Sequence, residues 1–480
     1  MSYQKFIKDI GIIGLTNLII ALRGLIILPI ITKLLGTENY GIWTQITVTL
    51  SLITPIATLN LPSALVRFLA AEKEKKEVQD GIYSVISIIF FVASSIGLVL
   101  ISFSTPISNF FGGEKILVQL LAFIIIIESI NQVFLNAFRA FRQMKRYSFF
   151  MILQTLGEVG LVVIAVFSGY KLFGVVLSLL IMRLINFIIM GGLIIKEMGV
   201  KIPSFSRIKE YLSFSLPTIV GGLSSWIVQS SDSYLIGFFL GTLYVGYYAP
   251  AYTIGGSIML FITPLSFVLP AFLSKFFDEN KMNTVKTYLK YSLKYFLILG
   301  IPSVFGLSIL SKQLLTIFSN SEIANQSYFI VPFVTLSILL FGIYEIIAQI
   351  INLKKKTKIT GIIWMTVAFL NLGMNFIFIP KFGIIGAAIT TFIAYVSLLI
   401  LTWYYSFKEF QFEIDWKFIL KSIFASVLMT LFIFCFNPIG LFKTITAIIV
   451  GALLYGILIF LFKGFSKKEV EFLKEFLKIN

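Results

Sequence analysis

Long apolar runs divide almost the whole chain, and this feature constrains the fold more than any other. Fourteen runs are each long enough to cross ~30 Å of hydrocarbon as a helix of about 20 residues. Hydrophobic residues make up 58% of the 480 residues and charged residues only 13%, against about 25% in a soluble protein. These numbers predict an all-α integral membrane protein with fourteen transmembrane helices.

The runs are separated by charged or Pro/Gly-containing breaks, which leave room for short loops and for no folded domain outside the membrane. They fall at about residues 10–33, 42–65, 82–104, 116–138, 148–168, 173–195, 212–238, 246–272, 291–311, 328–352, 359–380, 384–406, 418–436 and 444–462. The eighth run carries three prolines and two adjacent glycines, so we expect it to be the broken or bent span.

Composition excludes several classes of active site. Histidine is absent, and the single cysteine, Cys435, lies in an apolar run. These counts leave no histidine-based catalysis, no histidine or thiolate metal site and no disulfide framework. Neither a Walker A motif nor a dinucleotide-binding glycine motif is present. We therefore expect no catalytic residue, no metal centre, no cofactor, and transport that runs downhill or is coupled to an ion gradient.

Basic residues predict the orientation of the chain. Of the 39 Lys and Arg residues, 31 fall in the termini and alternate loops that would share one side, and six fall on the other side. Cytoplasmic loops collect Lys and Arg, so both termini should be cytoplasmic. The net charge of +17 therefore reflects topology and requires no nucleic-acid partner.

The chain also repeats internally. LGTENYGIW at 35–43 matches LGTLYVGYY at 240–248, and LPSALVRF at 61–68 matches LPAFLSKF at 269–276. Six crossings return the chain to its starting side, which predicts two six-helix bundles in the same orientation, as in transporters built from parallel repeats. We therefore expect four parts: residues 1–210 (spans 1–6), 211–410 (spans 7–12), 411–463 (spans 13–14) and 464–480. The last part should form an amphipathic helix on the cytoplasmic membrane surface, with a capping box at Ser466 and Glu469.

Four motifs support a family resemblance: KLLGTENYGIW, LPSALVRF, SSDSYLIG and PKFGIIGAAIT. In their order and spacing they resemble the polysaccharide transport family of the multidrug/oligosaccharidyl-lipid/polysaccharide exporter superfamily. The resemblance implies a multidrug-and-toxin-extrusion-like fold and a flippase that moves a lipid-diphosphate-linked oligosaccharide from the cytoplasmic to the outer leaflet. Ser233 follows Asp232 here, whereas family members often carry a basic residue at that point.

Charges inside the spans are the candidate functional groups, because a charge at the bilayer centre is costly unless it faces a cavity or a partner. A diphosphate suits the planar fork of arginine, so Arg23 and Arg183 are candidate head-group contacts. The alternative is that they neutralise Glu128 and Glu158 within the first bundle. Basic residues at the cytoplasmic mouth have the same two interpretations, head-group contact or positive-inside anchoring; these are Arg67, Arg139 and Lys275.

The remaining intramembrane acids, Asp232 and Glu345, lie without a basic neighbour in the spans of their own half and are candidates for coupling to H+ or Na+. Glu128 and Glu345 each precede a glutamine by four residues, Gln132 and Gln349, which places amide and carboxylate on one helix face. The alternative for each acid, Glu158 included, is hydrogen bonding between helices.

Three functions fit a chain of this class. The preferred one is a flippase acting by alternating access on a lipid-linked oligosaccharide, with membrane lipids and polysaccharide assembly proteins as further partners. A drug or organic-cation antiporter of the same superfamily would need an acidic, aromatic-lined cavity, against which the two mid-span arginines argue. A membrane-embedded glycosyltransferase would need a sizeable outer loop, and no outer loop here exceeds about 16 residues.

Overall fold

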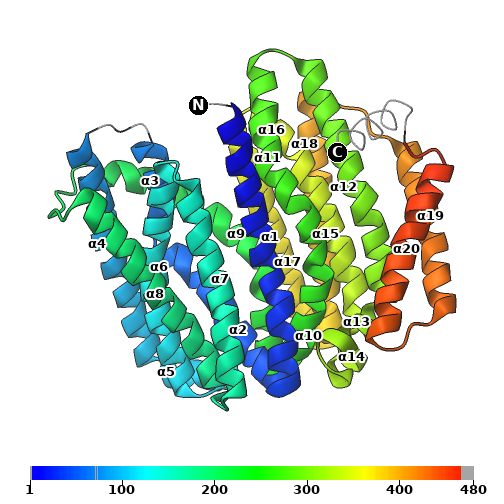
Figure 1. The fold of residues 1–480 in the computed structure, drawn as a ribbon, viewed down its shortest axis with the longest axis horizontal. Coiled ribbons are helices and arrows are strands. Elements are labelled where there is room, and N and C mark those ends of the chain that lie inside the picture. Colours follow the sequence, from blue (N-terminus) through cyan, green and yellow to red (C-terminus); the bar gives the residue numbers. More distant parts are fainter. Residues whose placement is uncertain (1–2, 71, 73, 466–480) are drawn as a thin grey trace. The chain divides into compact units, whose positions relative to one another are not determined.

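The computed structural model describes residues 3–70, 72 and 74–465, and within that part of the chain the regular structure is helical throughout. Figure 1 shows the helices, which run α1 (Tyr3–Leu34), α2 (Thr37–Ala57), α3 (Leu61–Leu69), α4 (Lys75–Ser102), α5 (Ser104–Phe111), α6 (Lys115–Ala140), α7 (Met144–Phe167), α8 (Lys171–Met198), α9 (Ile208–Leu240), α10 (Thr242–Gly255), η1 (Gly256–Ile258), α11 (Met259–Asp278), α12 (Met282–Ile309), α13 (Ser311–Phe318), α14 (Ser321–Ser327), α15 (Ile330–Ile347), α16 (Gln349–Leu353), α17 (Thr357–Phe382), α18 (Ile384–Glu409), α19 (Trp416–Phe436) and α20 (Leu441–Leu461).

The number of spans agrees with the apolar runs. In the described part, thirteen helical segments are long and apolar enough to cross a membrane, and the bent pair α2–α3 brings the number to fourteen. The all-α membrane fold is therefore confirmed. The amphipathic helix expected at the C-terminus falls on residues 466–480, which lie outside the described residues.

The sharpest break lies in the second span, not in the eighth as the prolines suggested. Between α2 and α3 the axis turns by 52°. The turn is made by Leu59 and Asn60, whose φ angles of 49° and 48° are left-handed and cannot continue a helix. In the eighth span, by contrast, a single 3-10 turn at Gly256–Ile258 joins α10 to α11, and the two form one span from Thr242 to Asp278.

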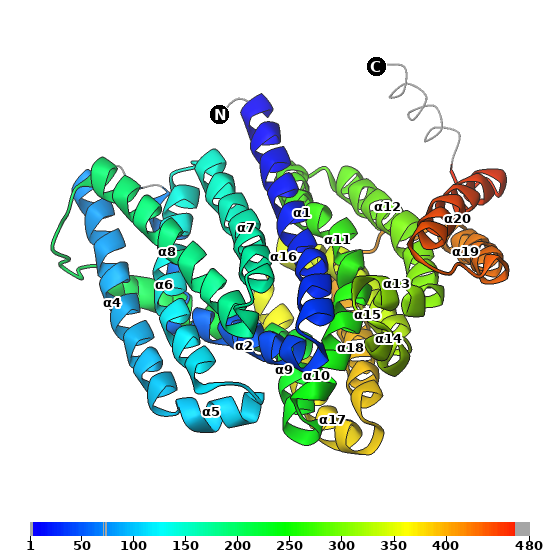
Figure 2. The same ribbon diagram turned by 60° about the horizontal axis from the view of Figure 1, so that its bottom comes forward.

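The helices group into two compact units. The first comprises residues 1–249 and 364–390, and the second comprises residues 250–363 and 391–480. In the first unit α6 is the central helix, since it packs against α2, α3, α4 and α8, while α1 packs along α7 (Figures 1 and 2). The division at residues 210 and 410 that the repeat suggests remains a prediction.

In the second unit α12 packs against α15 and α19, and α19 and α20 lie side by side (Figure 2). Two ion pairs attach α12 to the segment before α19. Lys290 Nζ lies 2.6 Å from the Glu413 carboxylate, and the buried Lys294 lies 3.5 Å from Asp415. The Lys290 ammonium also lowers the pKa of the Glu413 carboxyl.

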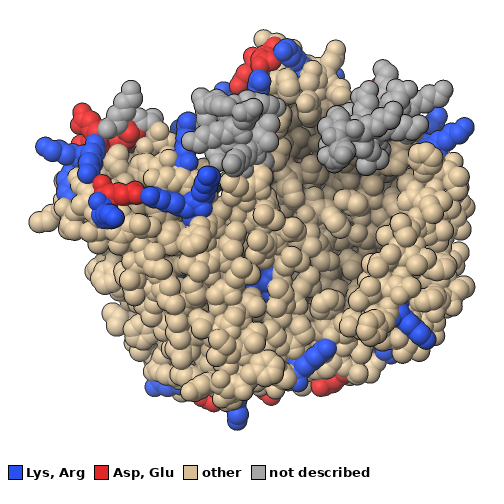
Figure 3. Space-filling model, viewed as in Figure 1, with Lys and Arg blue, Asp and Glu red and all other residues tan. Residues whose placement is uncertain are grey.

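Charged side chains avoid the long middle of the helices. On the face drawn in Figure 3, Lys, Arg, Asp and Glu gather toward the helix ends, and the wide band between them is almost uncharged. Many large apolar side chains on these helices are exposed, such as Phe91, Phe369 and Phe434. An exposed apolar band of this kind fits contact with lipid chains.

The two copies of the repeated segment pack on each other through their glycines. Gly41 and Gly246 are equivalent positions in the repeat, as are Thr37 and Thr242. A Cβ atom on Gly41 would lie 2.2 Å from the Thr242 carbonyl oxygen, and one on Gly246 would lie 2.2 Å from the Thr37 carbonyl oxygen. The contact is therefore reciprocal, and both positions require glycine for the helices to approach this closely.

Alanine at either of these glycines should destabilise the protein. We expect Gly41→Ala and Gly246→Ala each to cost about 1–3 kcal/mol, because the backbone oxygen that the new methyl group meets cannot move aside as a side chain could. The measurement is thermal unfolding of the purified protein in detergent. Gly222→Ala in α9 is the control, since nothing lies within 4 Å of its Cβ position. Equal melting temperatures for all three variants would contradict the reciprocal contact.

Candidate functional site

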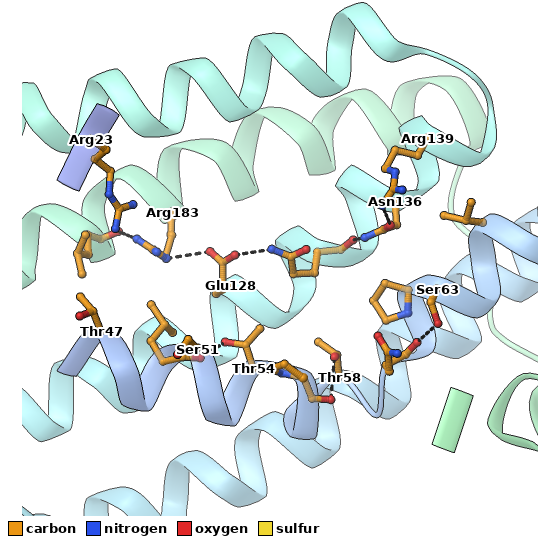
Figure 4. Close-up of a pocket in the computed structure, with 17 residues that line it drawn as sticks. Arg23, Thr47, Ser51, Thr54, Thr58, Ser63, Glu128, Asn136, Arg139 and Arg183 are labelled. Carbon is orange, nitrogen blue, oxygen red and sulfur yellow. Dashed lines mark hydrogen bonds and ion pairs between the residues drawn. The ribbon is translucent and has the colours of Figure 1, made fainter. Parts of the chain in front are cut away.

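A pocket of about 640 Å³ opens in the first unit between α1, α2, α3, α6 and α8 (Figure 4). Charged groups line it at two places. Arg23, Glu128 and Arg183 lie at one end, and Arg139 lies at the other, where α6 approaches its C-terminus. The uncharged polar residues between and beside them are Thr47, Ser51, Thr54, Thr58, Asn60, Ser63, Gln132 and Asn136.

A network of ion pairs joins four helices, α1, α6, α7 and α8, at the first end. Glu158 of α7 is fully buried, and its carboxylate lies between two arginines. Arg23 Nη1 lies 2.5 Å from Glu158 Oε2, and Arg183 Nη1 contacts Glu158 Oε1. Arg183 Nε also lies 2.8 Å from Glu128 Oε2. Two cations and two anions therefore balance one another at membrane depth.

The two arginines differ in their access to the pocket. The side chain of Arg183 is only 5% exposed, and both of its carboxylate partners are buried. Arg23 is 28% exposed and has the single carboxylate partner Glu158. Arg183 is therefore placed as a counter-ion inside the helix bundle. Arg23 is also a counter-ion, but it faces the pocket, where it is accessible to a ligand.

A chain of polar side chains runs along α6 from this network to the opposite end. Gln132 Nε2 donates to Glu128 Oε1 at 2.7 Å, and Asn136 Nδ2 donates to the Gln132 carbonyl oxygen at 2.8 Å. Arg139 Nη1 then donates to Asn136 Oδ1 at 3.0 Å. Arg139 bonds to a neutral amide here, so its positive charge is not balanced by a carboxylate in this chain of contacts.

The other two predicted mouth residues lie elsewhere. Arg67 does not line the pocket; its guanidinium carbon lies 4.7 Å from the centre of the Phe214 ring, a cation–π contact between α3 and α9. Lys275 belongs to the second unit, where its ammonium lies 5.9 Å from the Phe276 ring centre. Of the three predicted mouth cations, the structure thus places only Arg139 at this pocket.

Asp232 lies outside the pocket, in a separate buried cluster of the first unit. Its two carboxylate oxygens accept hydrogen bonds of 2.8 Å from Tyr248 Oη and from Asn375 Nδ2. Asn375 also donates to Asn371 Oδ1 at 3.3 Å and accepts from the Thr390 hydroxyl. Five polar side chains from α9, α10, α17 and α18 therefore meet at one point, each of them buried.

The acid of the second unit has a simpler environment. Glu345 of α15 is half-buried, and the Ser266 hydroxyl donates a hydrogen bond to its carboxyl group. Gln349 is buried, but it donates to the Glu345 backbone carbonyl rather than to the carboxylate. The Glu-x-x-x-Gln spacing thus pairs the two side chains in α6 but not in the second unit.

Sequence reasoning missed two groups of polar residues. The first is the hydroxyl stripe of α2, Thr47, Ser51, Thr54 and Thr58, whose spacing of four, three and four residues marks one helix face. The second is the pair Asn371 and Asn375, two amides four residues apart in an otherwise apolar span. Both patterns can be read from the sequence. They are less conspicuous than a charge because burying threonine or asparagine in a span costs less free energy.

Comparison with known proteins assigns the family. The family described as polysaccharide biosynthesis protein matches residues 6–277, which is more than half of the chain. The chain belongs to this family. The MatE family also matches residues 217–377. The resemblance based on the four sequence motifs is thereby confirmed.

Relatives of the chain include two proteins from Haloferax volcanii. The probable low-salt glycan biosynthesis flippase Agl15 is 24% identical over 402 residues, which cover 82% of this chain and 83% of Agl15. The probable flippase AglR is 29% identical over 263 residues, which cover 52% of this chain and 53% of AglR. The homology supports a transporter in polysaccharide biosynthesis, and the expectation of no catalysis is consistent with it.

Two solved structures share the fold. A lipid II flippase MurJ in an inward closed conformation superposes with a TM-score of 0.76 at 20% identity, covering 95% of this chain and 99% of that one. An inward-facing multidrug resistance MATE family transporter superposes with a TM-score of 0.69 at 15% identity, covering 82% and 95% of the two chains. The multidrug-and-toxin-extrusion-like fold is therefore confirmed for this multi-pass membrane protein.

The ion-pair network predicts unequal effects of removing its two arginines. Arg183→Leu leaves Glu128 and Glu158 without their shared partner, and breaking a buried pair from one side costs about 3–5 kcal/mol. Arg23→Ala leaves Glu158 bonded to Arg183, so we expect a loss of about 1 kcal/mol. Thermal unfolding in detergent measures both, with the exposed Arg142→Ala as control. Comparable losses for the two network variants would contradict the different roles assigned here.

Proposed function

We propose that this protein is a flippase that moves a polyprenyl-diphosphate-linked oligosaccharide from the cytoplasmic to the outer leaflet by alternating access. The observation that carries the proposal is the pocket of the first unit, which is polar, contains three arginines and one glutamate, and is built from membrane-spanning helices. A diphosphate needs such a setting, because its negative charge must leave water for a path of lower dielectric constant. Glycan-flippase relatives support the same substrate class.

Arg23 is the head-group contact that we propose. Its guanidinium has further N–H donors beyond the one used by Glu158, and its planar fork matches the oxygen atoms of a phosphate group. If Arg23 moves to the substrate, Glu158 keeps the contact with Arg183 and the 3.3 Å hydrogen bond from Gln154. Partner exchange therefore does not leave a buried carboxylate unpaired, which lowers its cost.

The proposed topology gives the side from which the head group enters the pocket. The positive-inside rule puts the loop beside Arg139 in the cytoplasm, together with both termini. Arg139 would then meet the head group as it enters and Arg23 would hold it deeper in the membrane. We propose the plasma membrane as the location, with polysaccharide assembly proteins supplying and consuming the glycan. Arg67 and Lys275 then serve as cytoplasmic anchors.

An organic-cation antiporter fits the same pocket less well. None of the described residues that line it is aromatic, so a flat drug ring has no stacking surface there. Each of the two glutamates near the pocket already contacts an arginine. A cationic drug would therefore meet a site whose acids are neutralised and whose mouth carries a further arginine.

Coupling to an ion is the second part of the proposal, and we assign it to the cluster around Asp232. The cluster brings a carboxylate, two amides and two hydroxyls together in the protein interior, and oxygen atoms of these types bind Na+ or exchange protons. Binding of a cation there would shift the conformational equilibrium to the extent that the two conformations differ in affinity. Glu345 remains the alternative coupling residue.

Replacing Arg23 tests the head-group contact. In proteoliposomes containing a fluorescent polyprenyl-diphosphate N-acetylglucosamine, an external quencher reports movement of the probe between leaflets. We expect Arg23→Ala to slow this movement by about 10–100-fold, the cost of a charge-assisted hydrogen bond. Arg23→Lys should recover part of the rate, because a point charge replaces a bidentate fork.

Arg142→Ala is the matched control, an exposed arginine outside the pocket. If Glu158→Gln restores the rate of Arg23→Ala, then Arg23 acts only as a counter-ion and the assigned contact is wrong. If wild type moves no probe at all, the flippase proposal itself fails for this class of lipid.

Replacing Asp232 tests coupling. Asp232→Asn keeps the shape and the hydrogen-bonding capacity of the side chain and removes its charge. With an imposed proton or sodium gradient, we expect the variant to retain exchange of the probe between leaflets and to lose the effect of the gradient. Asp278→Asn, an exposed acid in the second unit, is the control. If Asp232→Asn responds to both gradients as wild type does, Asp232 is not the coupling residue. Glu345→Gln would then be tested in the same way.

A further inference from the structure

The middle of the pocket differs chemically from its two ends. On one side lies the α2 stripe of Thr47, Ser51, Thr54 and Thr58, and on the other lies α6 with Glu128 and Asn136 (Figure 4). Gln132, which also lines the pocket, lies between these two residues along α6. Along α6, Glu128 and Arg139 are eleven residues apart, which corresponds to about 16 Å. A diphosphate, whose phosphorus atoms share one bridging oxygen, is too short to contact both charged ends at once, which leaves the uncharged middle for another part of the ligand.

The hydroxyl hydrogens of the α2 stripe are already used. Ser51 donates to the Val48 carbonyl oxygen at 2.8 Å, and Thr54 donates to the Leu50 carbonyl oxygen at 2.7 Å. The hydroxyls of Thr47 and Thr58 likewise donate to carbonyl oxygens of their own helix segment. What these side chains offer the pocket is therefore the lone pairs of their oxygens. Ser51 shows this role directly, since it accepts a 3.0 Å hydrogen bond from Trp226 Nε1.

The facing wall on α6 also offers an acceptor oxygen. The Gln132 amide nitrogen donates to Glu128 Oε1, and the Asn136 amide nitrogen donates to the Gln132 backbone carbonyl. Gln132 thereby keeps its side-chain oxygen as an acceptor. Both walls therefore offer acceptor oxygens to a ligand group rich in O–H and N–H donors, and each of the two α6 amide nitrogens keeps a second N–H. The α2 oxygens, whose hydrogens are used, repel an anion, which has only acceptors to offer.

We propose that this acceptor-lined middle of the pocket is a subsite for an uncharged sugar, a neutral hexose or N-acetylhexosamine, next to the diphosphate of the lipid-linked glycan. This inference rests on the proposed function and specifies the substrate class of the same site. A pyranose with several free hydroxyls supplies donors to both walls at once. A uronic acid in this position brings its carboxylate against the acceptor oxygens of the α2 stripe, so that wall of the subsite discriminates against it. A protonated amine would meet the acceptors but also the three arginines of the pocket.

Binding to the purified full-length chain tests the subsite. The probes are farnesyl diphosphate and its conjugates with glucose, galactose, N-acetylglucosamine and glucuronic acid. We expect at least one neutral sugar to increase affinity over farnesyl diphosphate and glucuronic acid to give no increase. Thr54→Val and Ser51→Ala should each reduce the increase given by the sugar by about threefold to tenfold, the effect of one hydrogen bond. Arg23→Ala should weaken all five probes.

Thr446→Val is the matched control, because its hydroxyl makes the same bond to the carbonyl four residues earlier but lies in α20, away from the pocket. Two results would overturn the subsite while leaving the flippase proposal intact. In the first, wild type binds all probes with equal affinity and Arg23→Ala lowers that affinity. In the second, a sugar increases affinity and both α2 variants retain the whole increase. Tighter binding of glucuronic acid than of every neutral sugar would also overturn it. Failure of all probes to bind would overturn the proposed function and the subsite with it.

Discussion

The carboxylate of Glu158 is the group on which the first unit depends, because it lies fully buried at membrane depth between arginines of two other helices. A charge in that position is costly without a partner. The two ion pairs of Glu158 tie α7 to its neighbours, to α1 through Arg23 and to α8 through Arg183. Glu128 extends the network to α6. Neutralisation of four charges thus fixes the relative positions of the helices that form the pocket.

The same arrangement leaves one arginine available to a ligand. Arg183 has two carboxylate partners and is buried, whereas Arg23 has one and faces the pocket. Because Glu158 is satisfied by Arg183 alone, Arg23 can exchange its partner for a phosphate without leaving an unpaired acid. The other parts of the pocket differ in chemistry. Arg139 lies at the far end, and acceptor oxygens of α2 and α6 lie between the charged groups. An anionic group with a donor-rich neutral neighbour matches this order.

The sequence predicted the membrane fold and the charged residues well, because hydrocarbon enforces long apolar runs and makes each interior charge conspicuous. It left open which arginine contacts which glutamate, since that depends on α1 packing along α7. It indicated the eighth span, which is interrupted by a 3-10 turn at Gly256–Ile258, but it did not reveal the sharper turn in the second span, which uses left-handed Leu59 and Asn60. It also passed over the α2 hydroxyls and Asn375, whose roles depend on the helices they face. The repeat glycines Gly41 and Gly246 were found as a motif, but their mutual contact required the fold.

The most direct test of partner exchange at Arg23 is an experimental structure of the full chain in lipid nanodiscs with bound farnesyl diphosphate, beside one without it. With the probe bound, we expect the Arg23 guanidinium to contact phosphate oxygens while Glu158 remains paired with Arg183. In the structure without the probe, Arg23 should contact Glu158. A bound diphosphate that contacts other residues, with Arg23 still paired to Glu158, would contradict the account.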